Sequence, residues 1–422
     1  MTDLAGRLIA FATSTCLAVA AAVGTAAAQD ATATAEANRA ALVILSADAL
    51  RLHHDAILVD GHNDLPWQVR TQGNSSFDEM DIARPQPALH TDIERLKRGG
   101  VGAQFWAAYV PASTMRQGAA TRYTLEQIDL IHRMVRRYPD TFEMAYTADD
   151  IVRIRRHGKI ASLIGIEGGH AIEDSLGVLR MFHELGVRYM TLTHSATLGW
   201  ADSATDEARH GGLTPFGEEV VRRMNRLGML VDISHVSADT MRDVLRVSRA
   251  PVIASHSSAF AIAPHPRNVP DDVLRLLPDN GGVVMVNFYS GFVVPESARL
   301  MAHAVEVSRQ FENELKDETA VKKAMDAWYA AHEIPSGSVQ HVVDHIDHMV
   351  QTAGIDHVGL GSDFDGINRT PRQLDDVSCF PYITQELLNR GYSREAIRKV
   401  LGENLLRAMR GAEQAARHDK SD

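Results

Sequence analysis

The 422-residue sequence has few cysteines, few aromatic residues and no excess of positive charge. It contains only two cysteines, Cys16 and Cys379, which excludes a small scaffold held together by disulfides. There are 43 Lys and Arg residues against 54 Asp and Glu, giving a formal net charge of −11. This balance argues against a protein that binds nucleic acid or an anionic membrane, because both functions need a basic face. A hydrophobic content of 45% also excludes a disordered chain, so we expect a globular protein that acts on a small substrate.

Long apolar runs are also scarce, and the clearest one lies near the N-terminus. Arg7 precedes an apolar segment from Leu8 to about Gly24, and small residues follow as far as Ala28. This order predicts a secretory signal peptide over residues 1–28. An uncleaved membrane anchor is the alternative, although the run is short for a spanning helix. The C-terminus is too polar for a lipid-anchor signal, so we expect an exported chain, periplasmic or secreted, without a membrane anchor.

Eight short apolar segments predict the β-strands of the remaining chain. They cover residues 57–64, 101–110, 160–167, 187–194, 228–235, 251–256, 282–289 and 357–363. Segments with helical periodicity lie between them, including residues 125–138, 176–185, 216–227, 240–248 and 339–351. Apolar strands that alternate with helices are typical of an α/β protein with a (β/α)8 barrel, the TIM barrel. A doubly wound open sheet is the alternative.

Two segments fall outside this alternation. Residues 29–52 form an N-terminal leader, and the charged segment at about 296–333 predicts a helical insertion after the seventh strand. We therefore expect a single catalytic domain over residues 53–410, followed by a polar tail at 411–422.

Residues that commonly bind metals lie at the ends of six predicted strands. They are His62, Asp64, Glu167, His194, His235, His256 and Asp363. The carboxyl ends of barrel strands meet at one mouth, so these side chains are expected to converge. A carboxylate such as Glu167 can bridge two cations, and two cations can hold a hydroxide and polarise a carbonyl. Imidazole and carboxylate ligands without thiolate suit zinc, with manganese, cobalt and iron left open.

Other histidines have less specific surroundings. His341, His345 and His348 share one face of the helix predicted at 339–351 and could in principle hold a metal. We favour a solvated helix face, because this helix lies away from the mouth and lacks the HExxH order. His170 follows Glu167 closely and is expected in a loop or behind the site.

Seven motifs together resemble the membrane (renal) dipeptidase family of metal-dependent barrels. In chain order they are Asp60-Gly61-His62-Asn63-Asp64-Leu65-Pro66-Trp67, Gly165-Ile166-Glu167-Gly168-Gly169-His170, Leu192-Thr193-His194-Ser195, Asp232-Ile233-Ser234-His235, Ala254-Ser255-His256-Ser257, Arg267-Asn268-Val269-Pro270-Asp271-Asp272 and Gly361-Ser362-Asp363-Phe364-Asp365-Gly366. The resemblance extends from about residue 52 to residue 409. It implies a dipeptidase that acts on small dipeptides, and it leaves a homodimer open as the assembly.

The resemblance also implies a binuclear zinc centre. His62 and Asp64 would bind one zinc ion, His235 and His256 would bind the other, and Glu167 would bridge the two ions. A hydroxide between the ions would then attack the peptide bond.

The remaining site residues would handle the substrate. By the resemblance, His194 would contact the scissile carbonyl or its tetrahedral intermediate, and Arg267 would hold the substrate carboxylate. Asp363 would act as the general acid and base, near the free α-amino group. Tyr289 would line the substrate pocket, although its packing in the strand explains it equally well.

Three functions remain to be distinguished. The first is a zinc dipeptidase, with tolerance of a D-residue at the C-terminal position left open. The second is a deacylase or lactonase that uses the same chemistry on another small amide or ester. The third is a binding protein without catalysis, which the complete set of ligand-type residues and Asp363 disfavour.

Overall fold

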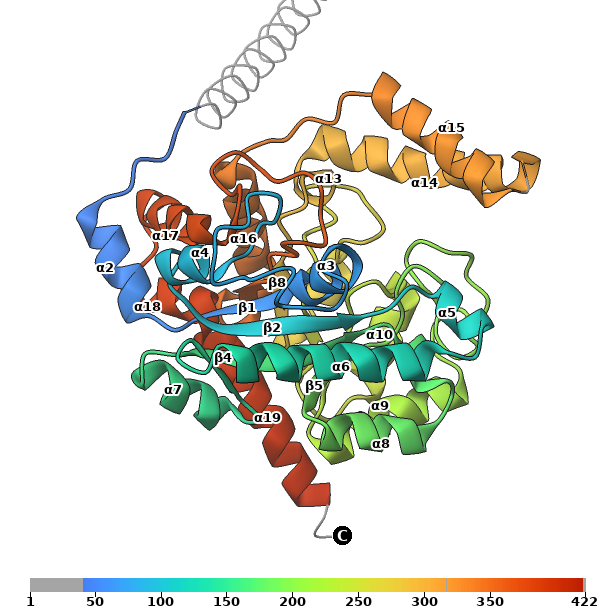
Figure 1. Cartoon of the computed structure of the whole chain (residues 1–422), viewed down its shortest axis with the longest axis horizontal. Coiled ribbons are helices and arrows are strands. Elements are labelled where there is room, and N and C mark those ends of the chain that lie inside the picture. The colour runs from blue at the N-terminus through green and yellow to red at the C-terminus, as the bar shows by residue number, and fades with distance from the viewer. Residues whose placement is uncertain (1–40, 316, 420–422) are drawn as a thin grey trace, which may run out of the picture. The chain divides into compact units, whose positions relative to one another are not determined.

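The computed structural model describes residues 41–315 and 317–419 (Figure 1). The predicted signal peptide, and the predicted leader as far as residue 40, lie outside these residues. No helix in the described ranges combines the length and the apolarity needed to cross a membrane.

The strands of the described residues form one parallel sheet. They are β1 (Leu58–Asn63), β2 (Val101–Tyr109), β3 (Phe142–Met144), β4 (Ile160–Glu167), β5 (Val187–Thr191), β6 (Leu230–Asp232), β7 (Ile253–Ala254), β8 (Val283–Val286) and β9 (Val358–Leu360). Every strand except β3 pairs with two barrel neighbours, and pairing of β1 with β9 and of β2 with β4 closes the ring. The predicted (β/α)8 barrel is therefore confirmed, and all eight predicted strands belong to it. The extra strand β3 pairs only with the first residues of β4.

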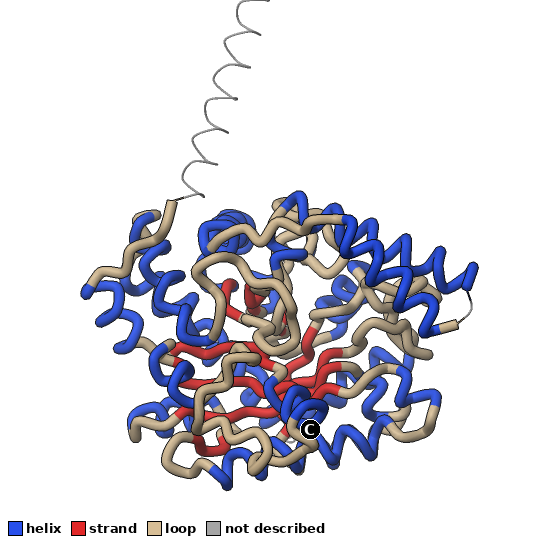
Figure 2. Tube along the Cα trace, turned by 45° about the horizontal axis from the view of Figure 1, so that its top comes forward, coloured by secondary structure: helices blue, strands red, loops and turns tan. Residues whose placement is uncertain are grey.

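Helices surround this barrel (Figure 2). The longer ones are α2 (Ala47–Asp55), α3 (Leu65–Gln72), α6 (Ala120–Arg137), α7 (Ala148–Arg156), α8 (Leu176–Glu184), α9 (Pro215–Leu227), α10 (Ala238–Val247), α16 (Val339–Ala353), α17 (Phe380–Asn389) and α19 (Asn404–Asp419). Short helices complete the connections: α4 (Ile93–Arg98), α5 (Ser113–Arg116), α11 (Asp271–Leu274), α12 (Leu277–Asn280), α13 (Ser290–Val293) and α18 (Arg394–Arg398). Local signals define their ends: Thr214 caps α9 through the backbone N–H of Gly217, and Gly228 ends this helix with a φ of 74°.

The predicted insertion after the seventh barrel strand is a pair of helices. They are α14 (Pro295–Leu315) and α15 (Glu318–Ala331), which lie side by side in Figure 1. The Arg309 guanidinium donates a hydrogen bond of 2.9 Å to the carbonyl of Thr205, in the loop after β5. This contact attaches α14 to the rim of the barrel.

Both ends of the domain extend beyond the predicted boundaries. The expected start at residue 53 falls inside α2, whose His53 side chain bonds to Thr384 of α17 at 2.7 Å. The expected end at residue 410 falls inside α19, which continues to Asp419 and buries Ala412 and Ala416. The alanines of this segment pack as one face of a helix, so residues 411–419 belong to the domain.

A tyrosine inside the barrel links its core to the mouth. Tyr189 of β5 is fully buried, and its hydroxyl lies 2.8 Å from Nδ1 of His62. A Cβ atom on Gly165 of the neighbouring strand β4 would lie 2.0 Å from this phenol ring. Glycine at position 165 therefore provides the space through which Tyr189 reaches His62.

Candidate active site

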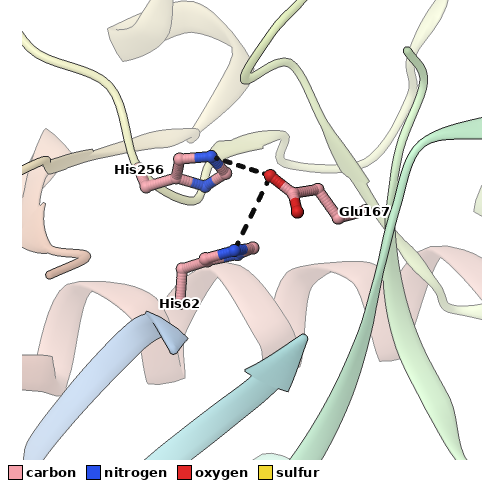
Figure 3. Close-up of side chains that lie close together, drawn as sticks. All are labelled: His62, Glu167 and His256. Carbon is pink, nitrogen blue, oxygen red and sulfur yellow. Dashed lines mark ion pairs between the residues drawn. The ribbon is translucent and has the colours of Figure 1, made fainter. Parts of the chain in front are cut away.

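Three side chains from different strands meet around one carboxylate oxygen (Figure 3). His62 lies near the carboxyl end of β1, Glu167 is the last residue of β4, and His256 follows β7. Oε1 of Glu167 lies 3.7 Å from Nε2 of His62 and 3.4 Å from Nε2 of His256. All three residues are buried, so their polar atoms face one another away from bulk water.

Two further histidines face the same oxygen. Nε2 of His235 lies 3.0 Å from Oε1 of Glu167, and Nε2 of His194 lies 3.7 Å from it. The Nε2 atoms of His235 and His256 are only 2.9 Å apart. Both histidines of this pair follow short strands, at the positions where loops leave the barrel.

Asp64 and Asp363 complete the cluster on the side of His62. Oδ2 of Asp64 lies 3.1 Å from Nε2 of His62. One oxygen of Asp363 accepts a hydrogen bond of 2.8 Å from the Asn287 side chain, which fixes this carboxylate. The possible metal donors fall into three groups with shared members: His62, Glu167 and His256; Glu167, His194 and His235; and His62, Asp64 and Asp363. The seven strand-end residues singled out from the sequence thus gather at one mouth.

The hydrogen bonds behind two histidines suit a metal-binding role. The hydroxyl of Tyr189 lies 3.2 Å from the carbonyl of Gly61, which can only accept. Donation to that carbonyl leaves the phenol oxygen free to accept the Nδ1 proton of His62. In the neutral ring that a metal would bind, the lone pair of Nε2 then points at Asp64 and Glu167. The donors present therefore fit the divalent cations expected from the sequence.

The electrostatics of the cluster show a lack of positive charge. Burial raises the pKa values of Glu167 and Asp363. Burial alone would lower the pKa of His62, but the negative charges of Asp64 and Glu167 raise it to about 10. Burial also lowers the pKa of His235 well below its usual value, so this ring is neutral. Buried carboxylates that favour a proton on His62, beside the neutral ring of His235, form a site that a bound cation would stabilise.

Two of the site residues have an unusual backbone. His235 has a φ of 65° and Asp363 a φ of 64°, both in the left-handed region. Such conformations cost about 1–3 kcal/mol and persist where the surroundings impose them. Here they turn the two side chains toward the mouth immediately after strands β6 and β9.

The mouth opens into a pocket of about 490 Å³, a size that suits a small ligand. Arg267 lines the pocket, although only 2% of its surface is exposed. Its Nη atoms contact the Ser257 hydroxyl and the His256 carbonyl at 3.4 and 3.3 Å, while Nε has no hydrogen-bond partner in the described part of the chain. Tyr289 also lines the pocket, and its hydroxyl contacts Met301 of α14 at 3.6 Å.

The histidines of α16 lie apart from this cluster. His345 is fully buried, with its ring nitrogens 2.9 Å from the Ala259 amide and 3.1 Å from the Val293 carbonyl. His348 lies 2.7 Å from Asp271. The expectation of a solvated helix face is therefore wrong for His345, which connects α16 to the loop at Ala259 and to α13. His170 lies behind the site as expected, with Nε2 2.9 Å from the Val110 carbonyl.

Several pocket residues were not identified from the sequence. Trp67, Tyr109 and Phe292 form aromatic parts of the lining, and Asp365 lies beside Asp64 and Asp363. The ring of Tyr109 lies 5.0 Å from that of Trp67 and 4.9 Å from that of His194. Tyr109 is the last residue of β2, and Trp67 follows β1 within the first motif. Their positions near the carboxyl ends of two strands were the sequence signal that could have identified them.

A parallel barrel with carboxylates and imidazoles gathered at its mouth defines a metal-dependent hydrolase of the TIM-barrel class. Comparison with known families is more specific: the model of the membrane dipeptidases, peptidase family M19, matches residues 46–422. The chain belongs to this family of metallodipeptidases.

Individual relatives agree with this assignment. The dipeptidase verJ of Clonostachys rogersoniana is 41% identical over 378 residues, which cover 87% of each chain. The structure of the probable dipeptidase PvdM from Pseudomonas aeruginosa matches with a TM-score of 0.77 and 26% identity, over 87% of this chain and 98% of that one. A metallopeptidase from Rhodobacter sphaeroides, solved with a phosphinate mimic of L-Ala-D-Ala, matches with a TM-score of 0.69 and 25% identity, over 85% of this chain and all of the other.

Proposed function

We propose that the protein is a binuclear zinc dipeptidase that hydrolyses free dipeptides and accepts a D-residue at the C-terminal position. The observation that carries this proposal is the position of Glu167 among four imidazoles, in the same pocket as the buried Arg267. In this proposal His62 and Asp64 hold one ion, His235 and His256 hold the other, and Glu167 contacts both. Two cations held there would polarise the scissile carbonyl and lower the pKa of the attacking water toward neutrality.

The side chains of the pocket supply the remaining chemistry. Asp363 takes a proton from the attacking water and delivers it to the leaving amine. Its raised pKa, caused mainly by burial, suits a group that must both accept and return a proton near neutral pH. His194 donates a hydrogen bond to the oxygen of the scissile carbonyl as negative charge develops there.

Charge recognition at both ends of the substrate explains a preference for dipeptides. The guanidinium of Arg267 can form paired hydrogen bonds with the C-terminal carboxylate. Asp363 lines the same pocket, and its carboxylate can also attract a free α-ammonium group. Tolerance of a D-residue is supported by the phosphinate mimic of L-Ala-D-Ala bound to the Rhodobacter sphaeroides relative.

A substrate panel tests the proposal. The metal-free protein is reloaded with zinc and incubated with L,L-dipeptides, L,D-dipeptides, blocked tripeptides, N-acyl amino acids and lactones. We expect hydrolysis of both dipeptide classes and little hydrolysis of the rest. Faster turnover of acyl amino acids or lactones would replace the dipeptidase with the deacylase or lactonase alternative.

Export is a separate part of the proposal, since the predicted signal peptide lies outside the described residues. N-terminal sequencing of the protein recovered from the extracytoplasmic fraction should begin at Gln29. An intact N-terminus on cytoplasmic protein would contradict export.

A further inference from the structure

A buried aspartate holds the segment that carries His256. Asp232, the last residue of β6, accepts hydrogen bonds from the backbone N–H of Ser255 at 2.8 Å and from its hydroxyl at 2.6 Å. It also accepts from the backbone N–H of Ser234 at 3.0 Å and from the Thr191 hydroxyl. Asp232 is fully buried, and both of its oxygens are used. In all four hydrogen bonds Asp232 is the acceptor.

Ser255 connects Asp232 to the imidazole of His256. Oγ of Ser255 lies 2.8 Å from Nδ1 of His256. The hydroxyl proton of Ser255 is already directed at Asp232, so its oxygen must accept the Nδ1 proton of His256. The neutral ring then carries its lone pair on Nε2, the atom that faces Glu167 at 3.4 Å (Figure 3).

The same arrangement recurs between β1 and the loop after β9, but without an imidazole. Asp60 of β1 accepts from the backbone N–H and the hydroxyl of Ser362, both at 2.7 Å. Ser362 directly precedes Asp363, as Ser255 precedes His256. The hydroxyl of Ser362 also contacts the carbonyl of His62 at 3.3 Å, and within the described part of the chain it contacts no ring nitrogen. The pair Asp232–Ser255 contacts a histidine ring and the pair Asp60–Ser362 does not, so the second pair serves as a control for the first.

The other metal-side histidine is supported differently. His62 uses Nδ1 to contact the neutral phenol of Tyr189, at 2.8 Å. Burial raises the pKa of Tyr189 well above its usual value, so this phenol keeps its proton. A carboxylate behind a serine increases the basicity of a ligand histidine more than a neutral phenol does.

We propose that Asp232 is a positioning residue that acts through Ser255 on His256, and that this relay strengthens the binding of one divalent cation at Glu167, His235 and His256. The inference rests on the proposed binuclear function. It adds a difference between the two ions. The relay contacts His256 directly, so it strengthens the ion beside His256 most; it reaches His62 only indirectly, through the hydroxyl of Tyr189, which also contacts Ser255.

Zinc affinity measures the relay directly. Metal-free wild-type, Ser255→Ala and Ser362→Ala proteins are titrated with zinc in competition with a chromophoric chelator. Both substitutions delete a hydroxyl that donates to a buried aspartate, but only Ser255 contacts a ligand imidazole. We expect Ser255→Ala to raise the dissociation constant of one ion roughly 10–100-fold and to weaken the other ion clearly less. Ser362→Ala should leave both constants near the wild-type values.

Folding is controlled by a second variant and a second measurement. Asp232→Asn keeps the size of the side chain and should weaken the same ion. Circular dichroism and thermal unfolding of the metal-free proteins report any general loss of structure. If Ser255→Ala or Asp232→Asn fails to fold, the zinc affinity of the other variant provides the test.

The outcomes separate the relay from the proposed function. Equal zinc affinities in wild-type and Ser255→Ala proteins, or equal losses in Ser255→Ala and Ser362→Ala, would overturn the relay. A wild-type protein that binds a single zinc ion would instead contradict the binuclear proposal. In that case the zinc affinity of Ser255→Ala still tests the relay. A weaker affinity for the single ion would support the relay, and an unchanged affinity would refute it.

Discussion

Glu167 lies closer to His235 than to the other imidazoles around it, with 3.0 Å between Oε1 and Nε2. The corresponding distances to His256, His62 and His194 are 3.4, 3.7 and 3.7 Å. One carboxylate oxygen therefore connects the histidines assigned to both ions. This central position makes Glu167 the residue whose loss affects the whole cluster.

The substitution Glu167→Ala should abolish binding of both ions, whereas a change at His62 or His256 should mainly weaken one. Elemental analysis of protein purified in parallel measures this directly. Glu184→Ala on α8, where the side chain is 71% exposed, is the matched control and should retain wild-type metal content. Glu167→Ala protein that keeps one tightly bound ion would contradict the bridging role.

The substitution Arg267→Lys should weaken substrate binding although it keeps the positive charge. An ammonium group cannot reproduce the two parallel hydrogen bonds of a guanidinium, so we expect KM for dipeptides to rise roughly 10–100-fold. Steady-state kinetics with a free dipeptide and its C-terminal amide provide the test. If wild-type protein cleaves the amide as well as the free acid, Arg267 does not bind the carboxylate.

The substitution Asp363→Asn should lower kcat by roughly 100-fold or more, because an amide cannot take up the proton of the attacking water. Metal content should stay near the wild-type value, since the structure fixes this side chain through Asn287. The competing role is that of a metal ligand, because Asp363 lies in one donor group with His62 and Asp64. Recovery of full activity in excess zinc would favour that ligand role.

His53 should make the metal-free protein sensitive to acid. Its Nε2 donates to the Gly99 carbonyl at 2.8 Å, and burial lowers its pKa from 6.5 to about 4. Because the unfolded chain binds the proton more tightly, the folded state loses stability as pH falls from about 6.5 toward 4, by about 2–3 kcal/mol at pH 4.5.

The variant His53→Gln removes this dependence. It should be less stable than wild type at pH 7.5, and the difference should shrink as pH falls to 4.5. Urea unfolding of the two metal-free proteins at several pH values measures the difference. Parallel stability curves would show that His53 does not contribute to acid sensitivity.

Much of the barrel could be predicted because its strands are short apolar segments separated by amphipathic helices. The residues His62, Glu167 and His256 could be linked from the sequence because a barrel brings the carboxyl ends of its strands together. Strand β3 could not be predicted, since its three residues carry too little pattern.

Side-chain contacts between segments far apart in the chain also could not be predicted from the sequence. Trp67 reaches the pocket from the first turn of α3 and Tyr109 from the end of β2, and no local pattern encodes the contact between their rings. Asp232 and Ser255 were visible as members of motifs, but the direction of their hydrogen bonds appears only in three dimensions. Residue 410 was predicted as the end of the domain because a polar helix with few buried alanines resembles a tail, whereas α19 continues to Asp419.

Zinc titration of the metal-free protein, followed by dipeptide hydrolysis and elemental analysis, tests the binuclear dipeptidase most directly. The account predicts that hydrolysis of an L,L-dipeptide reaches its maximum at two zinc ions per chain and that chelation abolishes it. Full activity with a single bound ion, or activity that survives complete removal of metal, would contradict it.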